Sequence, residues 1–454
     1  MAIREACGVF GIYNSEGNCA RSTYYGLYAL QHRGQQDCGI ATINDLELSC
    51  YKDEGLVGDV FSAEKLDELN GTIAIGHVRY STAADKSREN AQPLTFMYAK
   101  GSLAVAHNGT LVNGAELKSK YEQNGAVFHT STDAEVIAHS IALARLHTGS
   151  IQDAVARTMS QLKGSYSLVV MSSRKLVAAR DPLGFRPLCI GKHGDAFIVA
   201  SETCALDSVG ATFVRDVEPG EVICVFNGKL TSNRDNCTGK SSLCIFEHIY
   251  FARPDSIIDG QSVYNSRILA GRQVAKEHPI DGDVVIGVPD SGLNAAKGYS
   301  LETGISFEVG FIKNRYIGRT FIKPTQRERE EAVRIKLNPL RASVSGKRVI
   351  MVEDSIVRGT TIVPTIRLLR EVGAKEIHVI SAAPKFIAPC YFGTDVPSKD
   401  DLFACKYTTE EMRKLSGADS FGFLSLEGLK LIAPDSKCGF CDGCFTGNYP
   451  IPVK

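Results

Sequence analysis

One segment of the chain, residues 349–361, restricts the possible folds more than any other. It begins with the apolar run Val349–Val352, continues with two acidic residues, and then enters a loop that contains hydroxyl side chains and a glycine. A short apolar run of this kind predicts a buried strand, and residues 362–372 predict a helix directly after the loop. This order of strand, loop and helix is typical of a parallel sheet with crossover helices.

The loop has a chemistry of its own. Backbone N–H groups and the hydroxyls of Ser355, Thr360 and Thr361 at a helix start can hold a phosphate, and Gly359 permits close backbone approach. The two acids at the strand end, Glu353 and Asp354, can bind ribose hydroxyls directly or through a magnesium ion. The alternative is an ordinary acidic turn after a buried strand.

The rest of the second half repeats this rhythm. Strands are predicted at 284–288, 307–312 and 376–380, and a helix is predicted at 294–301. A polar segment, residues 227–240, precedes this region and predicts a junction between two domains. We therefore expect domains over 7–235 and 236–454, preceded by a short propeptide, residues 1–6.

The first half is predicted to be mixed α and β, with its helices grouped rather than strictly alternating with strands. Strands are expected at 72–78, 103–107, 167–171 and 221–226, and helices at 22–31 and from Thr132 onward. Thr132 and Glu135 have the spacing of a capping box.

Cys7 lies in a small apolar run and, taken alone, is most simply a buried hydrophobe. An amide hydrolase, however, needs a thiolate, a base, oxyanion donors and a grip on the substrate, and distant segments supply these groups. They are residues 77–82, 106–110 and 131–135. If residues 1–6 are removed, the freed α-amino group of Cys7 can take the thiol proton itself.

These segments resemble the class II glutamine amidotransferases, whose glutaminase domain is an N-terminal nucleophile (Ntn) αββα sandwich. The resemblance implies that Cys7 is the nucleophile and that Asn108 and Gly109 form the oxyanion hole. It also implies that Arg79 binds the α-carboxylate of glutamine and that Asp133 binds its α-ammonium group. Residues 30–35 and 180–188 resemble the same family. They place Arg33 near the glutamine pocket, whereas Arg180–Leu188 could equally be a structural turn.

The second half resembles the type I phosphoribosyltransferases, which bind 5-phosphoribosyl 1-pyrophosphate (PRPP). The resemblance implies a mobile flap over 313–322, although its basic residues could also be solvated loop charges. Glu353 departs from the family, in which an aspartate is usual. The implied PRPP ligands are Ser355, Arg358, Gly359, Thr360, Thr361, Lys313 and Arg319. The implied magnesium ligands are Ser291, Glu353 and Asp354.

The chain has 14 cysteines and no signal-like N-terminus, so we expect a cytoplasmic protein without a disulfide framework. The C-terminal cysteines resemble those of the iron–sulfur branch of glutamine PRPP amidotransferases. The resemblance implies a [4Fe-4S] cluster on Cys244, Cys390, Cys441 and Cys444. Spacing alone allows zinc as well, and Cys438 competes for a place in the set.

Together these resemblances cover almost the whole chain and imply transfer of glutamine nitrogen to PRPP, the first committed step of purine synthesis. They also imply a homotetramer inhibited by purine nucleotides. Lysine and arginine together number 51, as do aspartate and glutamate, so no overall charge favours nucleic acid or a membrane. The alternatives are a different class II amidotransferase, a regulator that senses PRPP, and a redox sensor built on the cysteines.

Overall fold

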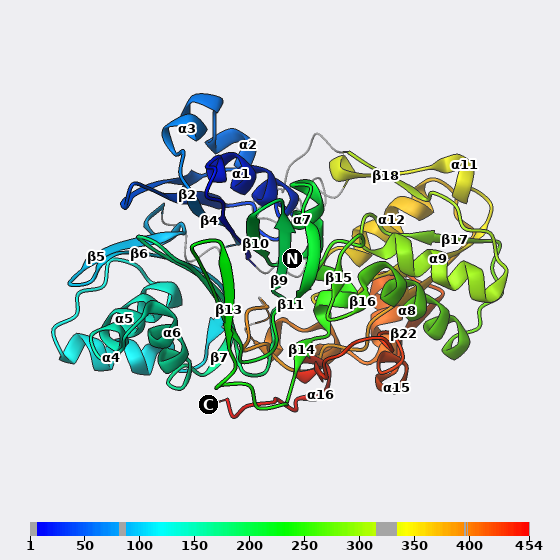
Figure 1. Ribbon diagram of the computed structural model, residues 1–454. Coiled ribbons are helices and arrows are strands. Elements are labelled where there is room, and N and C mark those ends of the chain that lie inside the picture. The colour runs from blue at the N-terminus through cyan, green and yellow to red at the C-terminus, as the bar shows by residue number, and fades with distance from the viewer. Residues whose placement is uncertain (1–6, 81–87, 315–333, 395, 397, 454) are drawn as a thin grey trace.

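The first half of the chain forms two stacked sheets, and the second half forms one parallel sheet beside them (Figure 1). The computed structural model describes residues 7–80, 88–314, 334–394, 396 and 398–453. Among these residues, no helix combines the length and the apolar character that crossing a membrane requires.

The first sheet has seven antiparallel strands with Cys7 directly before its central strand β1. In spatial order its strands are β11 (Thr212–Asp216), β9 (Cys189–His193), β10 (Ala196–Ala200), β1 (Gly8–Tyr13), β4 (Ile73–Arg79), β2 (Asp37–Asn44) and β3 (Glu47–Glu54). The second sheet has six: β13 (Lys229–Asn233), β12 (Val222–Phe226), β8 (Leu176–Arg180), β7 (Gly164–Ser172), β6 (Gly101–Leu111) and β5 (Leu94–Tyr98).

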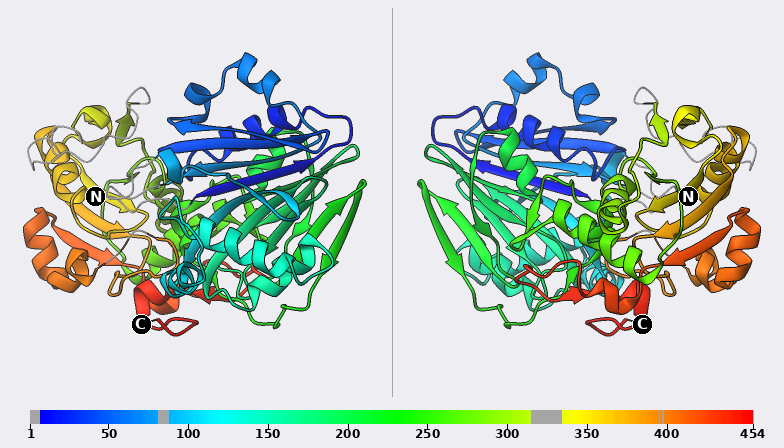
Figure 2. Two further views of the ribbon diagram at one scale, coloured as in Figure 1. Left: turned by 90° about the vertical axis from the view of Figure 1, so that its left-hand side faces the viewer. Right: turned by 90° about the vertical axis from the view of Figure 1, so that its right-hand side faces the viewer.

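The two sheets pack face to face, and helices cover their outer faces (Figure 2). The layer between them is apolar and contains Val9, Ala104 and Val169. Helices α1 (Cys19–Ala29), α2 (Val57–Val60), α3 (Ala63–Glu68) and α7 (Thr203–Ser208) lie on the seven-stranded sheet. Helices α4 (Gly114–Gln123), α5 (Asp133–Arg145) and α6 (Ile151–Met159) lie on the other, and the short helix η1 spans Arg88–Asn90. The predicted αββα sandwich is confirmed.

The second half is built on a four-stranded parallel sheet of strands β17 (Val284–Gly287), β20 (Arg348–Glu353), β21 (Glu376–Ser381) and β22 (Ser420–Phe423). Helices α8 (Val263–Glu277) and α9 (Gly292–Thr303) cover one face, while α11 (Arg341–Val344), α12 (Ile362–Glu371) and α14 (Thr409–Ser416) cover the other. This confirms the predicted parallel sheet with crossover helices.

The remaining elements are short. Three two-stranded sheets pair β14 (Leu243–Cys244) with β23 (Phe440–Cys441), β15 (Ile257–Ile258) with β16 (Gln261–Ser262), and β18 (Phe311–Lys313) with β19 (Leu337–Pro339). The short helices are η2 (Glu247–Phe251), η3 (Lys399–Asp401), α13 (Phe403–Lys406), α15 (Leu426–Leu429) and α16 (Gly443–Thr446). Of these, η2 is a π-helix, a rare form that often occurs at functional sites.

Three local predictions differ from the structure. The strand expected over 307–312 is reduced to a bridge from Phe307 to Val285, and β18 pairs away from the parallel sheet. The predicted junction over 227–240 contains β13, which pairs with β12 and adds an edge strand to the sandwich. Helix α5 begins after Thr132 as expected, but the capping box is wrong. The Glu135 carboxylate instead accepts hydrogen bonds from the backbone N–H groups of His129 and Thr130.

Candidate active sites

Cys7 lies at the start of β1, where the pairing of Gly8 with Val78 brings it next to the end of β4. Its Sγ lies 3.8 Å from the backbone carbonyl of Tyr80. Burial raises the pKa of the Cys7 thiol to about 11, and the nearby Arg79 guanidinium only partly opposes this. At neutral pH the thiol therefore keeps its proton, so an attack by sulfur requires a base within reach.

Arg79 is buried at the end of β4 and donates to Asp37 across the sheet at 3.0 Å. Asp37 faces Arg79 because β2 and β4 pair these two positions directly. Burial raises the pKa of Asp37 to about 6 in spite of the opposing Arg79 charge. The sequence motifs did not identify Asp37, since only the sheet pairing places it beside Arg79.

The candidate oxyanion residues lie on β6. The amide nitrogen of Asn108 is buried and has no hydrogen-bond partner among the described residues. Gly109 has φ +142°, and a Cβ at this position would lie 2.1 Å from the carbonyl oxygen of Ser165. Only glycine fits there, and an unpartnered amide donor stands directly before it. This is the arrangement that a developing negative charge needs.

Asp133 is the first residue of α5, and its buried carboxylate binds back to β6. Its Oδ2 accepts a hydrogen bond of 2.8 Å from the backbone N–H of Leu111, two residues after Gly109. Burial raises the pKa of Asp133, and the Leu111 hydrogen bond opposes that shift. The structure thus ties Asp133 to the strand that carries Asn108 and Gly109.

Arg33 lies behind Cys7, and its guanidinium faces the second half of the chain. Its Nε donates to the Cys7 backbone carbonyl at 3.1 Å, and its terminal nitrogens donate to Glu202 (2.5 Å) and Glu247 (2.8 and 3.0 Å). Both carboxylates and the arginine are fully buried. Each guanidinium nitrogen is therefore engaged, and Arg33 holds the backbone at Cys7 rather than presenting a free group to the candidate site.

Two further arginines, both in the segment 180–188, cross the same junction. Arg180 donates to both oxygens of Asp259 at 2.8 and 2.7 Å, and Arg186 donates to Glu247 at 3.0 Å. The carbonyls of Leu183 and Phe185 accept hydrogen bonds from Ser242 and Cys244. This segment, which could have been a simple turn, is the main polar attachment between the halves.

The second candidate site lies at the carboxyl end of β20 and opens into a cavity. Residues that line this cavity are Tyr250, Glu353, Asp354, Ser355, Ile356, Val357, Arg358, Gly359, Thr361 and Ile362. The structure therefore brings together most of the residues predicted for PRPP. Tyr250 was not predicted; it reaches the cavity from η2, far away in the sequence.

The two acidic residues of this cavity are both mostly buried and adjacent. Burial raises the pKa of Glu353 well above its usual value, and the Asp354 charge adds to this shift. Burial also raises the pKa of Asp354, while hydrogen bonds from Ser291 and Ser355 oppose it. Burial and mutual repulsion make two adjacent carboxylate charges costly, and a divalent cation would offset that cost.

Ser291 directly precedes α9 and donates its hydroxyl hydrogen to Asp354. Lys313, on β18, pairs with Asp290 in the same loop as Ser291. Arg358 lies 3.6 Å from Asp401. Arg319 and most of the predicted flap, together with residues 1–6, lie outside the described residues.

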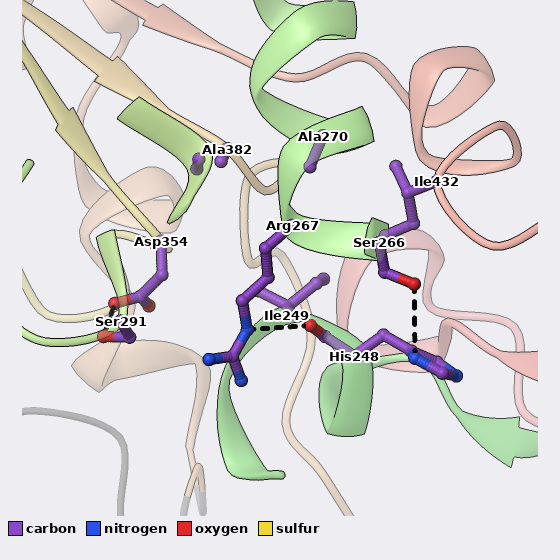
Figure 3. Close-up of a pocket in the computed structure, with 10 residues that line it drawn as sticks. His248, Ile249, Ser266, Arg267, Ala270, Ser291, Asp354, Ala382 and Ile432 are labelled. Atoms are coloured by element: carbon purple, nitrogen blue, oxygen red, sulfur yellow. Dashed lines mark hydrogen bonds between the residues drawn. The ribbon is translucent and has the colours of Figure 1, made fainter. Parts of the chain in front are cut away.

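A second cavity lies behind this site, and Arg267 extends through it from α8 (Figure 3). Arg267 is buried and donates to the backbone carbonyls of His248, Tyr250 and Ala252 at 2.7–3.1 Å, so it holds η2 and the residue after it in place. Burial lowers the pKa of Arg267, and the Asp354 carboxylate is the largest influence that opposes this shift. Arg267, which the sequence did not single out, thus connects η2 with the acidic end of β20.

The four predicted cluster cysteines converge at the base of the molecule. Cys244 and Cys441 are direct partners in the parallel pairing of β14 and β23, and the Cys444 carbonyl accepts from Ile387 and Ala388, close to Cys390. Burial raises the pKa of Cys444, and Cys244, Cys390 and Cys441 each raise it further. The described residues nevertheless show no group of three side chains with the geometry of a metal site.

Cys438, the competing cysteine, faces elsewhere. Burial raises its pKa to about 12, and the next influence is the Asp259 carboxylate, which is paired with Arg180. Cys438 is not among the leading influences on the pKa of Cys441 or Cys444. These contacts favour Cys441 and Cys444 as the C-terminal ligands, as the sequence motif implied.

Comparison with known proteins agrees with this two-site architecture. A model of glutamine amidotransferase domains matches residues 77–208, and a model of phosphoribosyl transferase domains matches residues 266–386. An amidophosphoribosyltransferase of Methanocaldococcus jannaschii is 48% identical, with 99% of this chain and 98% of the relative covered. The amidophosphoribosyltransferase of Bacillus subtilis is also 48% identical, over 99% and 95% of the two chains.

A solved structure of glutamine PRPP amidotransferase from B. subtilis, complexed with ADP and GMP, superimposes with a TM-score of 0.91 at 47% identity. The match covers 99% of this chain and 98% of that one. Identity at this level over the full length of both halves leaves neither half without a counterpart. The chain therefore belongs to the amidophosphoribosyltransferase family, and it is an enzyme that combines a glutamine amidotransferase with a phosphoribosyltransferase.

Proposed function

We propose that the two sites described above divide one reaction between them. Glutamine, PRPP and water give 5-phosphoribosylamine, glutamate and pyrophosphate, as the family assignment requires. Cys7 releases ammonia from glutamine, and the cavity at Glu353–Thr361 holds PRPP. One observation carries this division. The unpartnered Asn108 amide lies on the strand beside Asp133, whereas the acidic residues that line the other cavity lie at the end of β20, far away in the sequence.

In the glutaminase half, the Cys7 sulfur attacks the glutamine amide, and the oxyanion binds to the Asn108 side chain and the Gly109 N–H. Arg79 orients the α-carboxylate of glutamine, and Asp133 its α-ammonium group. The base is the α-amino group of Cys7, freed by cleavage after Ala6. That amine has an ordinary pKa near 7.7–8.0 and is partly unprotonated at neutral pH, so it can take the thiol proton as the sulfur attacks. Because burial raises the pKa of the thiol to about 11, proton removal has to accompany the attack rather than precede it. Water then hydrolyses the thioester.

In the transferase half, the loop Ser355–Thr361 holds the 5-phosphate at the start of α12, and Arg358 adds positive charge. Glu353 and Asp354 would hold the ribose hydroxyls and a magnesium ion, with Ser291 beside them. Bound Mg²⁺ would offset the charge of pyrophosphate. We expect Lys313 and Arg319 to bind the pyrophosphate. Ammonia attacks the anomeric carbon and pyrophosphate leaves; exclusion of water from the site would favour this reaction over hydrolysis.

We assign a [4Fe-4S] cluster to Cys244, Cys390, Cys441 and Cys444, with a structural role because neither half-reaction transfers electrons. Cys244 and Cys390 are close enough to raise the pKa of Cys441 and, together with Cys441, that of Cys444. Four such thiols are a donor set that a metal centre would deprotonate and stabilise. Iron and acid-labile sulfide analysis of anaerobically purified protein tests this assignment. Four irons per chain are expected, whereas stoichiometric zinc without sulfide would refute it.

The remaining proposals follow from the family and the relatives. We place the domain boundary at 235/236 and the mature N-terminus at Cys7. The B. subtilis structure contains ADP and GMP, so we expect purine nucleotides to inhibit this enzyme as well. We also expect a homotetramer in the cytoplasm.

The two-site proposal is tested by Cys7→Ala. Glutamine-dependent formation of phosphoribosylamine should be lost, while formation from added ammonium salts should be retained. Asp354→Asn is the matched variant of the other site and should abolish both activities. Loss of both activities in Cys7→Ala, or of neither, would contradict the division of labour. Mass spectrometry of active protein should find Cys7 as the first residue.

A further inference from the structure

Arg186 is a buried arginine at the junction of the two halves, and neither proposed half-reaction uses it. Its side chain is 1% exposed. Nη1 donates to Glu247 at 3.0 Å, and Nη2 donates to the backbone carbonyl of Phe392 at 2.7 Å. Its third nitrogen, Nε, is buried without a partner among the described residues. An unpaired buried N–H is costly, so this donor is available to an acceptor that comes within reach.

The cysteines are the groups near Arg186 that could use this donor. The Cys244 N–H donates to the carbonyl of Phe185, the residue directly before Arg186. The Cys390 Sγ accepts a hydrogen bond of 3.4 Å from the N–H of Phe392, whose carbonyl Arg186 binds. Backbone hydrogen bonds therefore bring two of the four cysteines close to the arginine.

Close packing agrees with this geometry. At Gly393, with φ +102°, a Cβ would lie 2.8 Å from Nη2 of Arg186. The backbone that follows Cys390 and Phe392 therefore lies directly against the guanidinium.

We propose that Arg186 is a positioning residue for the four-cysteine site. Its guanidinium supplies the counter-charge, and its Nε–H donates to a cysteine sulfur once a bound metal centre has replaced the thiol protons. The inference rests on the proposed ligands Cys244, Cys390, Cys441 and Cys444, but it does not depend on whether they bind a [4Fe-4S] cluster or zinc. Hydrogen bonds and charges around metal-bound sulfur set both affinity and reduction potential.

The same guanidinium links the cysteines to the nucleophile. Arg186 shares the Glu247 carboxylate with Arg33, whose Nε holds the Cys7 carbonyl. Arg186 is also one of the charges that oppose the raised pKa of the Cys7 thiol. A change at the metal centre that moves Arg186 would therefore alter the support of Cys7.

The test compares Arg186→Met and Arg186→Lys with Arg180→Met in the full-length enzyme purified without oxygen. Arg180 is the matched control, because it is equally buried and also pairs across the junction, but its cysteine neighbour is Cys438. Metal release from folded protein to ferrozine, or to a zinc indicator if zinc is found, is followed by absorbance. Loss of an outer partner of a metal ligand typically weakens binding about 10- to 100-fold.

We expect release from Arg186→Met to be about 10- to 100-fold faster than from wild type, and release from Arg186→Lys to be about 10-fold faster, because lysine keeps the charge but not the Nε–H. Arg180→Met should release metal at the wild-type rate. If the centre is iron–sulfur, its reduction potential should fall in Arg186→Met, because the lost positive charge had favoured the added electron.

Wild-type rates in both Arg186 variants would overturn the inference, as would an equal acceleration in Arg180→Met. If Arg186→Met does not fold, Arg186→Lys decides alone, and a wild-type rate from it overturns the proposal. Wild-type protein without any metal would refute the ligand assignment itself. That result comes from the metal analysis before any variant is compared, so the two failures are distinguishable.

Discussion

Glu247→Gln should destabilise the junction between the two halves more than any exposed charge substitution does. The Glu247 carboxylate is fully buried and accepts hydrogen bonds from Arg33 (2.8 and 3.0 Å) and Arg186 (3.0 Å). Two buried guanidinium groups and two carboxylates, Glu247 and Glu202, balance one another there. Glutamine has nearly the same shape but no charge, so the substitution leaves one buried positive charge without compensation.

The magnitude follows from that uncompensated charge. Removing one partner of a buried ion pair costs about 3–5 kcal/mol of the free energy of unfolding. For a unit of 150–250 residues, each 1 kcal/mol lowers the unfolding midpoint by about 2–4 °C, so the expected decrease is roughly 6–20 °C. The substitution also loosens Arg33, whose Nε binds the Cys7 carbonyl. Glutamine-dependent activity should therefore fall further than ammonia-dependent activity.

Differential scanning fluorimetry of ligand-free protein measures the midpoint, with metal content matched between variants. The control is Glu410→Gln, which removes a carboxylate from an exposed pair with Arg413 and should leave the midpoint unchanged. The double variant Glu247→Gln/Arg186→Gln removes the excess charge and should recover part of the loss. A decrease in Glu247→Gln no larger than in the exposed control would refute the argument that this junction depends on charge balance.

Three further predictions concern the two sites. Because burial raises the pKa of Asp37 to about 6, the folded protein binds its proton more tightly than the unfolded chain, so Asp37 lowers stability as pH rises from about 4 to 6. In Asp37→Asn, unfolding midpoints measured at pH 4–7 should no longer show this dependence on pH. The same substitution should raise KM for glutamine, because it frees Arg79. An unchanged pH dependence would contradict the raised pKa of Asp37. Gly109→Ala should reduce glutamine-dependent kcat roughly 100-fold, as expected for a lost oxyanion donor. The reason is that the added Cβ would collide with the Ser165 carbonyl and displace the strand. Equal loss of ammonia-dependent activity would argue for misfolding instead. Glu353→Gln should weaken the dependence of PRPP binding on Mg²⁺ in calorimetry, and wild-type magnesium dependence would exclude Glu353 from the metal site.

The sequence predicted the parts of both sites that local patterns encode. Cys7, Asn108 and Asp354 each lie at a strand end or on a strand whose apolar pattern is clear, and the structure places them where those strands end or pair. Glu353, where the family usually has an aspartate, is the last residue of β20 and directly precedes Asp354. Motifs of this kind are readable because neighbouring residues carry both the fold signal and the chemistry.

Residues that act through distant partners were not predictable in the same way. Arg33 and Glu247 lie 214 positions apart, and neither has a local pattern that indicates burial. A charged residue is usually exposed, so a buried one is revealed only by its partner. Asp37 became recognisable only through its pairing with Arg79, and Tyr250 through the π-helix that carries it into the PRPP cavity. The prediction of a strand over 307–312 was wrong for a related reason. Phe307 forms only a bridge to Val285, whereas the end of the segment belongs to β18 and pairs with β19.

The charge count at the junction bears on why one chain carries both activities. The first half contributes Arg33, Arg186 and Glu202 to the buried network, and the second half contributes Glu247. The first half alone would therefore hold one excess positive charge directly behind Cys7, and its cost would fall when the second half docks. Support of the nucleophile thus depends on the same π-helix that places Tyr250 in the PRPP cavity. A glutaminase assembled in this way is complete only when an acceptor site is attached, which limits the release of ammonia without a use for it.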